Sequence, residues 1–84
     1  MLILLALLAQ APSGAEPAEC RSAPAEVLVG ERYRRHVPTR AKRLSGARAV
    51  RVLWPGQAMT MDYRVDRVNL RVDHRRLITA VSCG

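Results

Sequence analysis

The spacing of apolar positions predicts one helix in the first half of the chain. Within residues 31–45, apolar side chains recur at intervals of four, four and three residues, at Tyr33, Val37, Ala41 and Leu44. These intervals place them on one face of a helix. Proline is tolerated in a first turn but not in a helix interior, so Pro38 indicates a start near Arg35 rather than Glu31. Gly46 predicts the end of this helix.

Residues 50–54, 64–72 and 77–83 have the composition of three β-strands. The first is β-branched and apolar and stops at Pro55-Gly56, which predicts a turn. The second strand alternates, and its core face is expected to pack on the helix through Val68, Leu70 and Val72. The third follows so short a connection that it must run antiparallel to the second. The fold class predicted is α+β, with one helix packed on a small mixed sheet.

The beginning of the chain has the pattern of an export signal. An apolar run from Leu2 to Ala9 precedes small residues spaced as Ala9-Gln10-Ala11, which is typical of a signal peptide and its cleavage site. The run is too short to span a bilayer, which needs roughly 20 apolar residues. We therefore expect a signal peptide at 1–11, a flexible leader at 12–19, one domain at 20–84, and a secreted or periplasmic protein. Cleavage after Ala15 or Ala18, or an uncleaved hydrophobic tail, is the alternative.

The chain has two cysteines, Cys20 and Cys83. In an exported chain two cysteines allow one intramolecular disulfide, which here would tie the two ends of the domain together. The chain-entropy estimate for a loop of this length is roughly 4 kcal/mol. The alternatives are two free thiols or half of a metal site, and no histidine stands near either sulfur in the sequence.

The charge is strongly positive, with 14 Lys+Arg against 7 Asp+Glu and a net charge of +7. Such a surface can bind nucleic acid, anionic lipid or an acidic protein. However, the arginines are spread from Arg21 to Arg76, and the three aromatic side chains are isolated, so a platform for base stacking is missing. We favour a solvated basic surface and keep an arginine-rich module for nucleic acid or an anionic envelope surface as the alternative function.

Residue patterns typical of enzymes are missing. The histidines, His36 and His74, have no nucleophile patterned around them, and the serines lack the glycine frame of a nucleophile elbow. The sequence has no phosphate-binding glycine loop and no metal-ligand cluster. We therefore expect neither an enzyme nor a bound cofactor or metal.

The loop at 55–63 is the strongest candidate for function. In the strand that follows, Arg67, Asn69 and Arg71 share the face opposite the apolar one. If the loop folds back over that face, guanidinium groups can donate hydrogen bonds to Thr60 and Asp62. The alternative is a solvated strand face beside an unordered loop.

Several segments together resemble the potato inhibitor I superfamily of serine-protease inhibitors, and most closely its disulfide-tethered, elastase-inhibitor-like branch, peptidase inhibitor family 78. The resemblance covers residues 20–84. The segments that carry it are Leu28-Val-Gly30, the helix, Val50-Arg-Val-Leu53 with Pro55-Gly56, Thr60-Met-Asp-Tyr-Arg64, Asp66-Arg-Val68, Val72-Asp73 and Cys83-Gly84.

The resemblance implies a reactive bond between Met61 and Asp62. Met61 would enter the specificity pocket of the protease. The flanking parts of the binding loop would be Met59 and Thr60 on the acyl side and Tyr63 and Arg64 on the leaving side. A monomeric inhibitor of elastase-, chymotrypsin- or subtilisin-like serine proteases is the function implied. An inhibitor fold whose loop is inactive is a further possibility.

The resemblance also implies how the loop is supported. Arg67 matches a family arginine that holds the loop from below. Where the plant inhibitors have a second supporting arginine, this chain has Asn69, so Arg71 is the candidate substitute.

Overall fold

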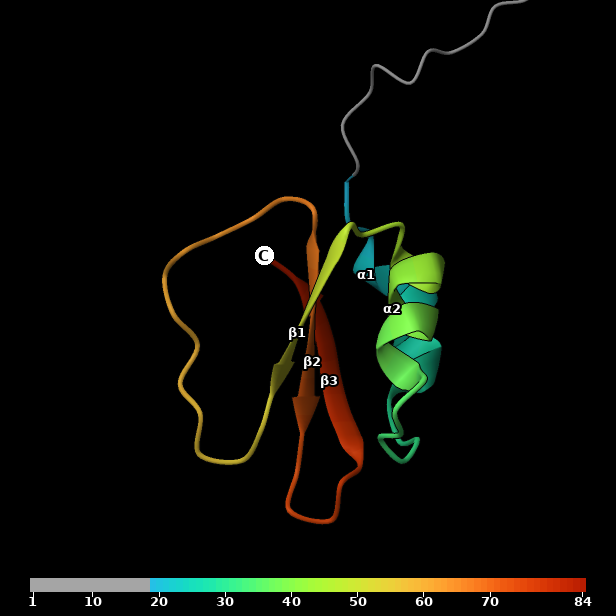
Figure 1. Ribbon diagram of the computed structural model, residues 1–84, viewed down its shortest axis with the longest axis vertical. Helices are drawn as coiled ribbons and strands as arrows, with labels where there is room; N and C mark the ends of the chain where they lie inside the picture. The colour runs from blue at the N-terminus through green and yellow to red at the C-terminus, as the bar shows by residue number, and fades with distance from the viewer. Residues whose placement is uncertain (1–18) are drawn as a thin grey trace, which may run out of the picture.

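The computed structural model describes residues 19–84, so the predicted signal peptide and the leader up to residue 18 lie outside the described part. Two helices cover one face of a three-stranded sheet, and a long loop passes over the other face (Figure 1). The elements in chain order are α1 (Ser22–Ala25), a 3-10 turn (Glu26–Leu28), α2 (Val37–Ser45), β1 (Ala49–Leu53), β2 (Arg67–Val72) and β3 (Ile78–Cys83).

The sheet is mixed, as predicted. Its strand order is β1-β2-β3, with β1 parallel to β2 and β2 antiparallel to β3. β2 begins at Arg67 rather than Arg64, because residues 65–66 form a turn in which the Arg67 N–H donates to the carbonyl of Arg64 at 3.4 Å. The central strand is buried at five of its six positions. The helix-covered face is therefore the core, and the polar residues of β2 face the loop.

The helix α2 has the predicted signals at both ends. Pro38 lies in its first turn, and Gly46 caps it in the left-handed conformation with φ 75°. The Gly46 N–H donates to the carbonyl of Lys42 at 2.8 Å. Val37 and Ala41 are buried against β2, while Leu44 packs at the edge of the core.

The short helix α1, which precedes α2 in the chain, was not predicted. Its four residues are too few to show a periodic pattern, and Pro24 within them argues against a helix on sequence grounds. Packing accounts for its formation, since Ala25 in α1 and Leu28 in the 3-10 turn are both 0% exposed. Tertiary burial of two side chains thus replaces the missing local signal.

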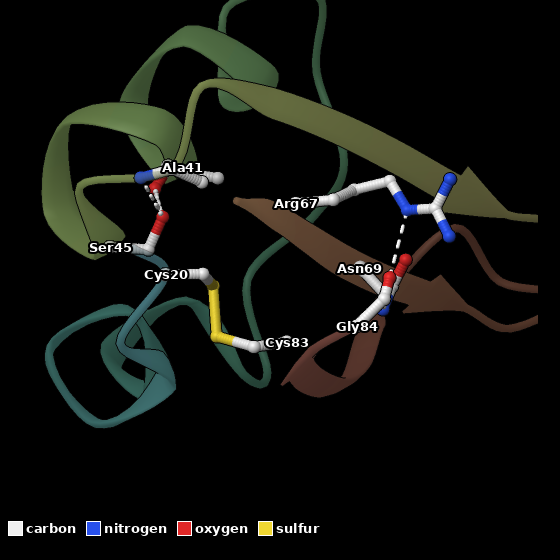
Figure 2. The surroundings of a disulfide bond; sticks show 8 residues. Cys20, Ala41, Ser45, Arg67, Asn69, Cys83 and Gly84 are labelled. Atoms are coloured by element: carbon white, nitrogen blue, oxygen red, sulfur yellow. Dashed lines mark hydrogen bonds between the residues drawn. A yellow bond between two sulfur atoms is a disulfide. The ribbon is translucent and has the colours of Figure 1, made fainter. Parts of the chain in front are cut away.

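The predicted disulfide between Cys20 and Cys83 is confirmed, with a Cα–Cα distance of 5.8 Å and a sequence separation of 63 (Figure 2). It joins the segment before α1 to the last residue of β3. The Cys20 N–H also donates to the carbonyl of Val65, at 2.9 Å, near the end of the long loop. The bridge therefore fixes Gly84, which follows Cys83, beside β2. Within residues 19–84, no helix has the length and apolar character needed to cross a membrane.

Replacing Gly46 with alanine should lower the free energy of unfolding by about 1–2 kcal/mol, because a side chain disfavours the left-handed region. A Cβ placed there would lie 3.6 Å from the Glu19 carbonyl oxygen, so the cost is backbone strain rather than a clash. Denaturant unfolding measures the change, with Thr39→Ala on the exposed side of α2 as control. An unfolding midpoint equal to that of the wild type would contradict this role for Gly46.

Candidate functional site

The long loop is the connection between two parallel strands. β1 and β2 run in the same direction, so residues 54–66 must carry the chain from the end of β1 back to the start of β2. The loop does this on the side of the sheet away from the helices (Figure 1). The strand pairing therefore requires a long connection, and in this fold the connection lies over the polar face of β2.

The beginning of the loop is attached to the body of the domain by Trp54. Its ring and the ring of Tyr33 form a T-shaped pair with 5.0 Å between centroids, and the guanidinium of Arg76 lies 5.3 Å from the Trp54 ring centroid. The backbone N–H of Trp54 donates to Oε1 of Gln57 at 2.8 Å, and the backbone N–H of Gln57 donates to the carbonyl of Trp54 at 3.0 Å. These contacts fix the turn from which the loop departs.

The tip of the loop offers large side chains to solvent. Met61 is 95% exposed, Tyr63 75% and Met59 43%. Apolar side chains grouped on one exposed surface can mark an interaction site. Met61 is the most exposed of these three.

Arg67 holds the loop from beneath, where the sequence placed it. Its side chain is buried, and its Nη2 donates to the backbone carbonyl of Asp62 at 2.5 Å, with Nη1 3.5 Å from the Asp62 carboxylate. Its Nε donates to the backbone oxygen of Gly84 at 2.9 Å (Figure 2). One guanidinium thus joins the loop to the segment fixed by the disulfide.

A second arginine, Arg51 of β1, supports the loop and was not predicted. Its Nη1 donates to the Thr60 hydroxyl at 2.9 Å and lies 3.4 Å from the Asp62 carboxylate. Its Nε donates to Oδ1 of Asn69 at 3.0 Å. The parallel register pairs Arg51 with Asn69, which orients it toward the loop. Asn69 therefore supports the loop through Arg51, and its amide lies 3.5 Å from the Gly84 oxygen.

Two of the predicted residues lie apart from this network. Arg71 is exposed and is level with Leu53, and no hydrogen bond or ion pair in the described structure joins its side chain to the loop. Arg64 pairs with Asp66 through two 3.1 Å hydrogen bonds, outside the supported tip. Alternation puts Arg51 on the face opposite Val50 and Val52, but the parallel register is what places it beside Asn69 and the loop.

The carboxylate of Asp62 is the electrostatic centre of the site. The pKa of Asp62 falls from its usual 3.8 to about 2, chiefly because the Thr60 hydroxyl donates to it. Its own backbone N–H and the guanidinium groups of Arg67 and Arg51 lower the pKa further. Asp62 is therefore ionised at neutral pH, as its two arginine neighbours require.

A Thr60→Val variant should raise the pKa of Asp62 toward 3.8, because the largest stabilising donor is removed. The contribution of the ionised carboxylate to loop order is present above pH 3.8 and is lost as the pH falls through about 2. An NMR titration of the side-chain carboxyls measures the Asp62 midpoint in the wild type and in the Thr60→Val variant. Asp73, whose pKa is lowered mainly by the Leu77 backbone N–H, is the internal control. A wild-type midpoint near 3.8 would contradict the network.

A cavity of about 280 Å³ lies between the loop and the sheet. Its walls include Met59, Met61 and Tyr63 from the loop and Asn69, Ser82 and Gly84 from the sheet side. Gly84 lies against the Tyr63 ring, where an added Cβ would approach Cε1 to 2.7 Å. The Tyr63 ring thus rests against a glycine, where a side chain would displace it.

The described residues hold no cluster of three or more histidine, cysteine or acidic side chains that could bind a metal. His36 and His74 are both exposed. The candidate site is the surface loop at residues 54–66.

The sequence pattern of the Peptidase inhibitor I78 family matches residues 20–84. The chain belongs to the peptidase inhibitor I78 family. It is thus a protease inhibitor rather than an enzyme, and its partner is a protease, as the sequence predicted. This I78 inhibitor is also similar in structure to the elastase inhibitor AFUEI, with 28% identity and a TM-score of 0.52 over 68% of this chain and 78% of that one. A comparison with curated proteins finds no match.

Proposed function

We propose that the protein inhibits serine proteases of the elastase, chymotrypsin or subtilisin type by presenting Met61–Asp62 as a substrate-like bond. One observation carries the proposal: Arg51 contacts Thr60 on one side of this bond and Asp62 on the other, while Met61 between them is 95% exposed. The similarity to an elastase inhibitor, together with the resemblance to the potato inhibitor I superfamily, supports this class of target.

The tethering of both sides favours inhibition over hydrolysis. A loop already held in its bound shape loses little conformational entropy on docking, so its contacts contribute to affinity. If the serine of the protease attacks the Met61 carbonyl, the amine released belongs to Asp62. Arg67 holds the Asp62 carbonyl at 2.5 Å and Arg51 holds its carboxylate, so that amine stays beside the acyl group. Rejoining of the bond then competes successfully with attack by water.

The side chain of Met61 determines the class of pocket. Methionine is unbranched, flexible and apolar, so it fills hydrophobic specificity pockets of varied shape. A trypsin-like pocket carries an acidic residue at its base. Burying a thioether there leaves that charge without a partner, so trypsin-like enzymes are poor targets.

The proposed setting is extracellular or periplasmic. The Cys20–Cys83 disulfide is the kind of bond that persists in oxidising compartments, and the apolar segment at 2–9 supplies an export signal. A disulfide also suits a small domain that works among proteases, since it limits local opening. The protein is proposed to act there as a monomer, one loop to one protease.

The basic-module alternative loses support because several arginines already have protein partners. Arg51 and Arg67 hold the loop, and Arg40 pairs with Glu31 at 2.7 Å. Arg64 likewise pairs with Asp66 at 3.1 Å. These four guanidinium groups are therefore occupied by protein partners and less available to phosphates.

Titrating the purified protein into elastase, chymotrypsin, subtilisin and trypsin tests the proposal. Activity of the first three should fall stoichiometrically, and mass spectrometry after long incubation should find cleavage at Met61–Asp62 alone. Rapid cleavage without inhibition would indicate an inhibitor fold with an inactive loop. Binding to nucleic acid that weakens steeply with salt and ignores Met61 would support the basic module instead.

A further inference from the structure

The two methionines of the loop are chemically reactive as well as apolar. A thioether sulfur is oxidised readily where solvent reaches it. Both line the cavity beneath the loop, but Met61 is 95% exposed and Met59 only 43%. Both cysteines of the described residues are in the disulfide, so no thiol there competes for an oxidant. The most accessible sulfur of the domain therefore lies at the point of protease contact.

We propose that Met61 is an oxidative modification site that switches inhibition off. This inference rests on the proposed function. The oxidant is a peroxide: a lone pair of the Met61 sulfur attacks one peroxide oxygen, the O–O bond breaks, and an S=O bond forms. The second oxygen leaves as water after taking up the protons. The sulfur loses two electrons to the peroxide, and methionine sulfoxide is the product.

The sulfoxide acts on binding and leaves the fold intact. The hydrogen bonds that hold the loop join Thr60 and Asp62 to Arg51 and Arg67, and none involves the Met61 sulfur. Oxidation therefore leaves the support in place and adds a polar oxygen to the side chain that must enter an apolar pocket. Burying that oxygen without a hydrogen-bond partner should weaken inhibition by between about 5-fold and 150-fold.

The exposed position of Met61 makes its oxidation reversible. A side chain as exposed as Met61 is accessible to methionine sulfoxide reductases, which return the thioether. The loop thus gives a protease inhibitor whose activity follows the oxidant level around it. Proteolysis is released when peroxide rises and is suppressed again after reduction.

Graded hydrogen peroxide treatment tests the switch. Peptide mapping measures oxidation of Met59 and Met61 separately, and inhibition of elastase is measured on the same samples. Loss of inhibition should follow oxidation of Met61, and methionine sulfoxide reductase should restore it. Met61→Leu, which keeps an apolar side chain without sulfur, should show no change on treatment relative to its own untreated sample. Met59→Leu should remain as sensitive as the wild type.

The outcomes separate the two proposals. Full oxidation of Met61 with unchanged inhibition overturns the switch alone, as does equal peroxide sensitivity of Met61→Leu and the wild type. An untreated protein that inhibits no serine protease overturns the proposed function and the switch together. If inhibition is lost in step with oxidation of Met59 rather than Met61, the sensitive sulfur is that of Met59, and the inference is overturned.

Discussion

An Arg67→Ala variant is expected to behave as a substrate where the wild type behaves as an inhibitor. The substitution removes the donor that holds the Asp62 carbonyl at 2.5 Å and the Gly84 oxygen at 2.9 Å. It also removes one of the two cations beside the Asp62 carboxylate. The leaving side of the Met61–Asp62 bond then has Arg51 as its remaining tether.

The size of the effect follows from the hydrogen bonds lost. A bond to a charged donor contributes about 1.5–3 kcal/mol, so the inhibition constant should rise roughly 10- to 150-fold. The larger change is in the fate of the complex. Once the bond opens, the Asp62 amine moves away from the acyl group before it can rejoin, and water completes hydrolysis.

Complex lifetime and the fraction of cleaved chain, followed by mass spectrometry, measure this change. Arg71→Ala is the matched control, because Arg71 lies on the same strand but is exposed and makes no loop contact in the described structure. Arg67 is 8% exposed, so thermal unfolding of both variants must accompany the assay. A complex of Arg67→Ala that lasts as long as that of Arg71→Ala would sink the supporting role.

A Met61→Lys variant should exchange one set of target proteases for another. In an elastase- or subtilisin-like pocket the lysine ammonium would be buried without a partner, which should weaken inhibition by more than roughly 100-fold. In a trypsin-like pocket the same ammonium meets an acidic residue. Inhibition of trypsin should therefore appear as inhibition of elastase disappears.

Inhibition constants for elastase, subtilisin and trypsin, measured side by side, test the exchange. The stability of the fold should be unaffected, because Met61 is 95% exposed and contributes nothing to the core. Met59→Lys adds the same charge two residues away and should not transfer activity to trypsin. If Met61→Lys leaves elastase inhibition as it was, the specificity residue lies elsewhere.

Local patterns in the sequence identify α2 and the three strands because their residues carry their own signals. The helix has Pro38 and Gly46 at its ends, and β2 alternates around Val68 and Leu70. The helix α1 carries no such signal, since burial of Ala25 in the assembled domain stabilises it.

The residues that support the loop are only partly predictable, because some of them act through contacts between segments distant in the sequence. Arg67 follows the loop directly and is found by the alternation of β2. Arg51 contributes through the parallel register with Asn69, a pairing between distant segments that alternation within one strand cannot reveal. Arg71 is level with Leu53, where the loop leaves the sheet, whereas the tip of the loop contacts Arg51 and Arg67. Placing the tip requires knowing the path of the whole connection.

The parallel pairing of β1 and β2 also determines how such a protein can evolve. β1 has five residues, so the returning chain must cover about 16 Å before β2 can begin. Natural selection cannot shorten the loop below that span without losing the sheet, but the residue at its tip is free of that constraint. Under the proposed function, new target specificities would therefore arise by single substitutions at position 61, which is 95% exposed and lies outside the core.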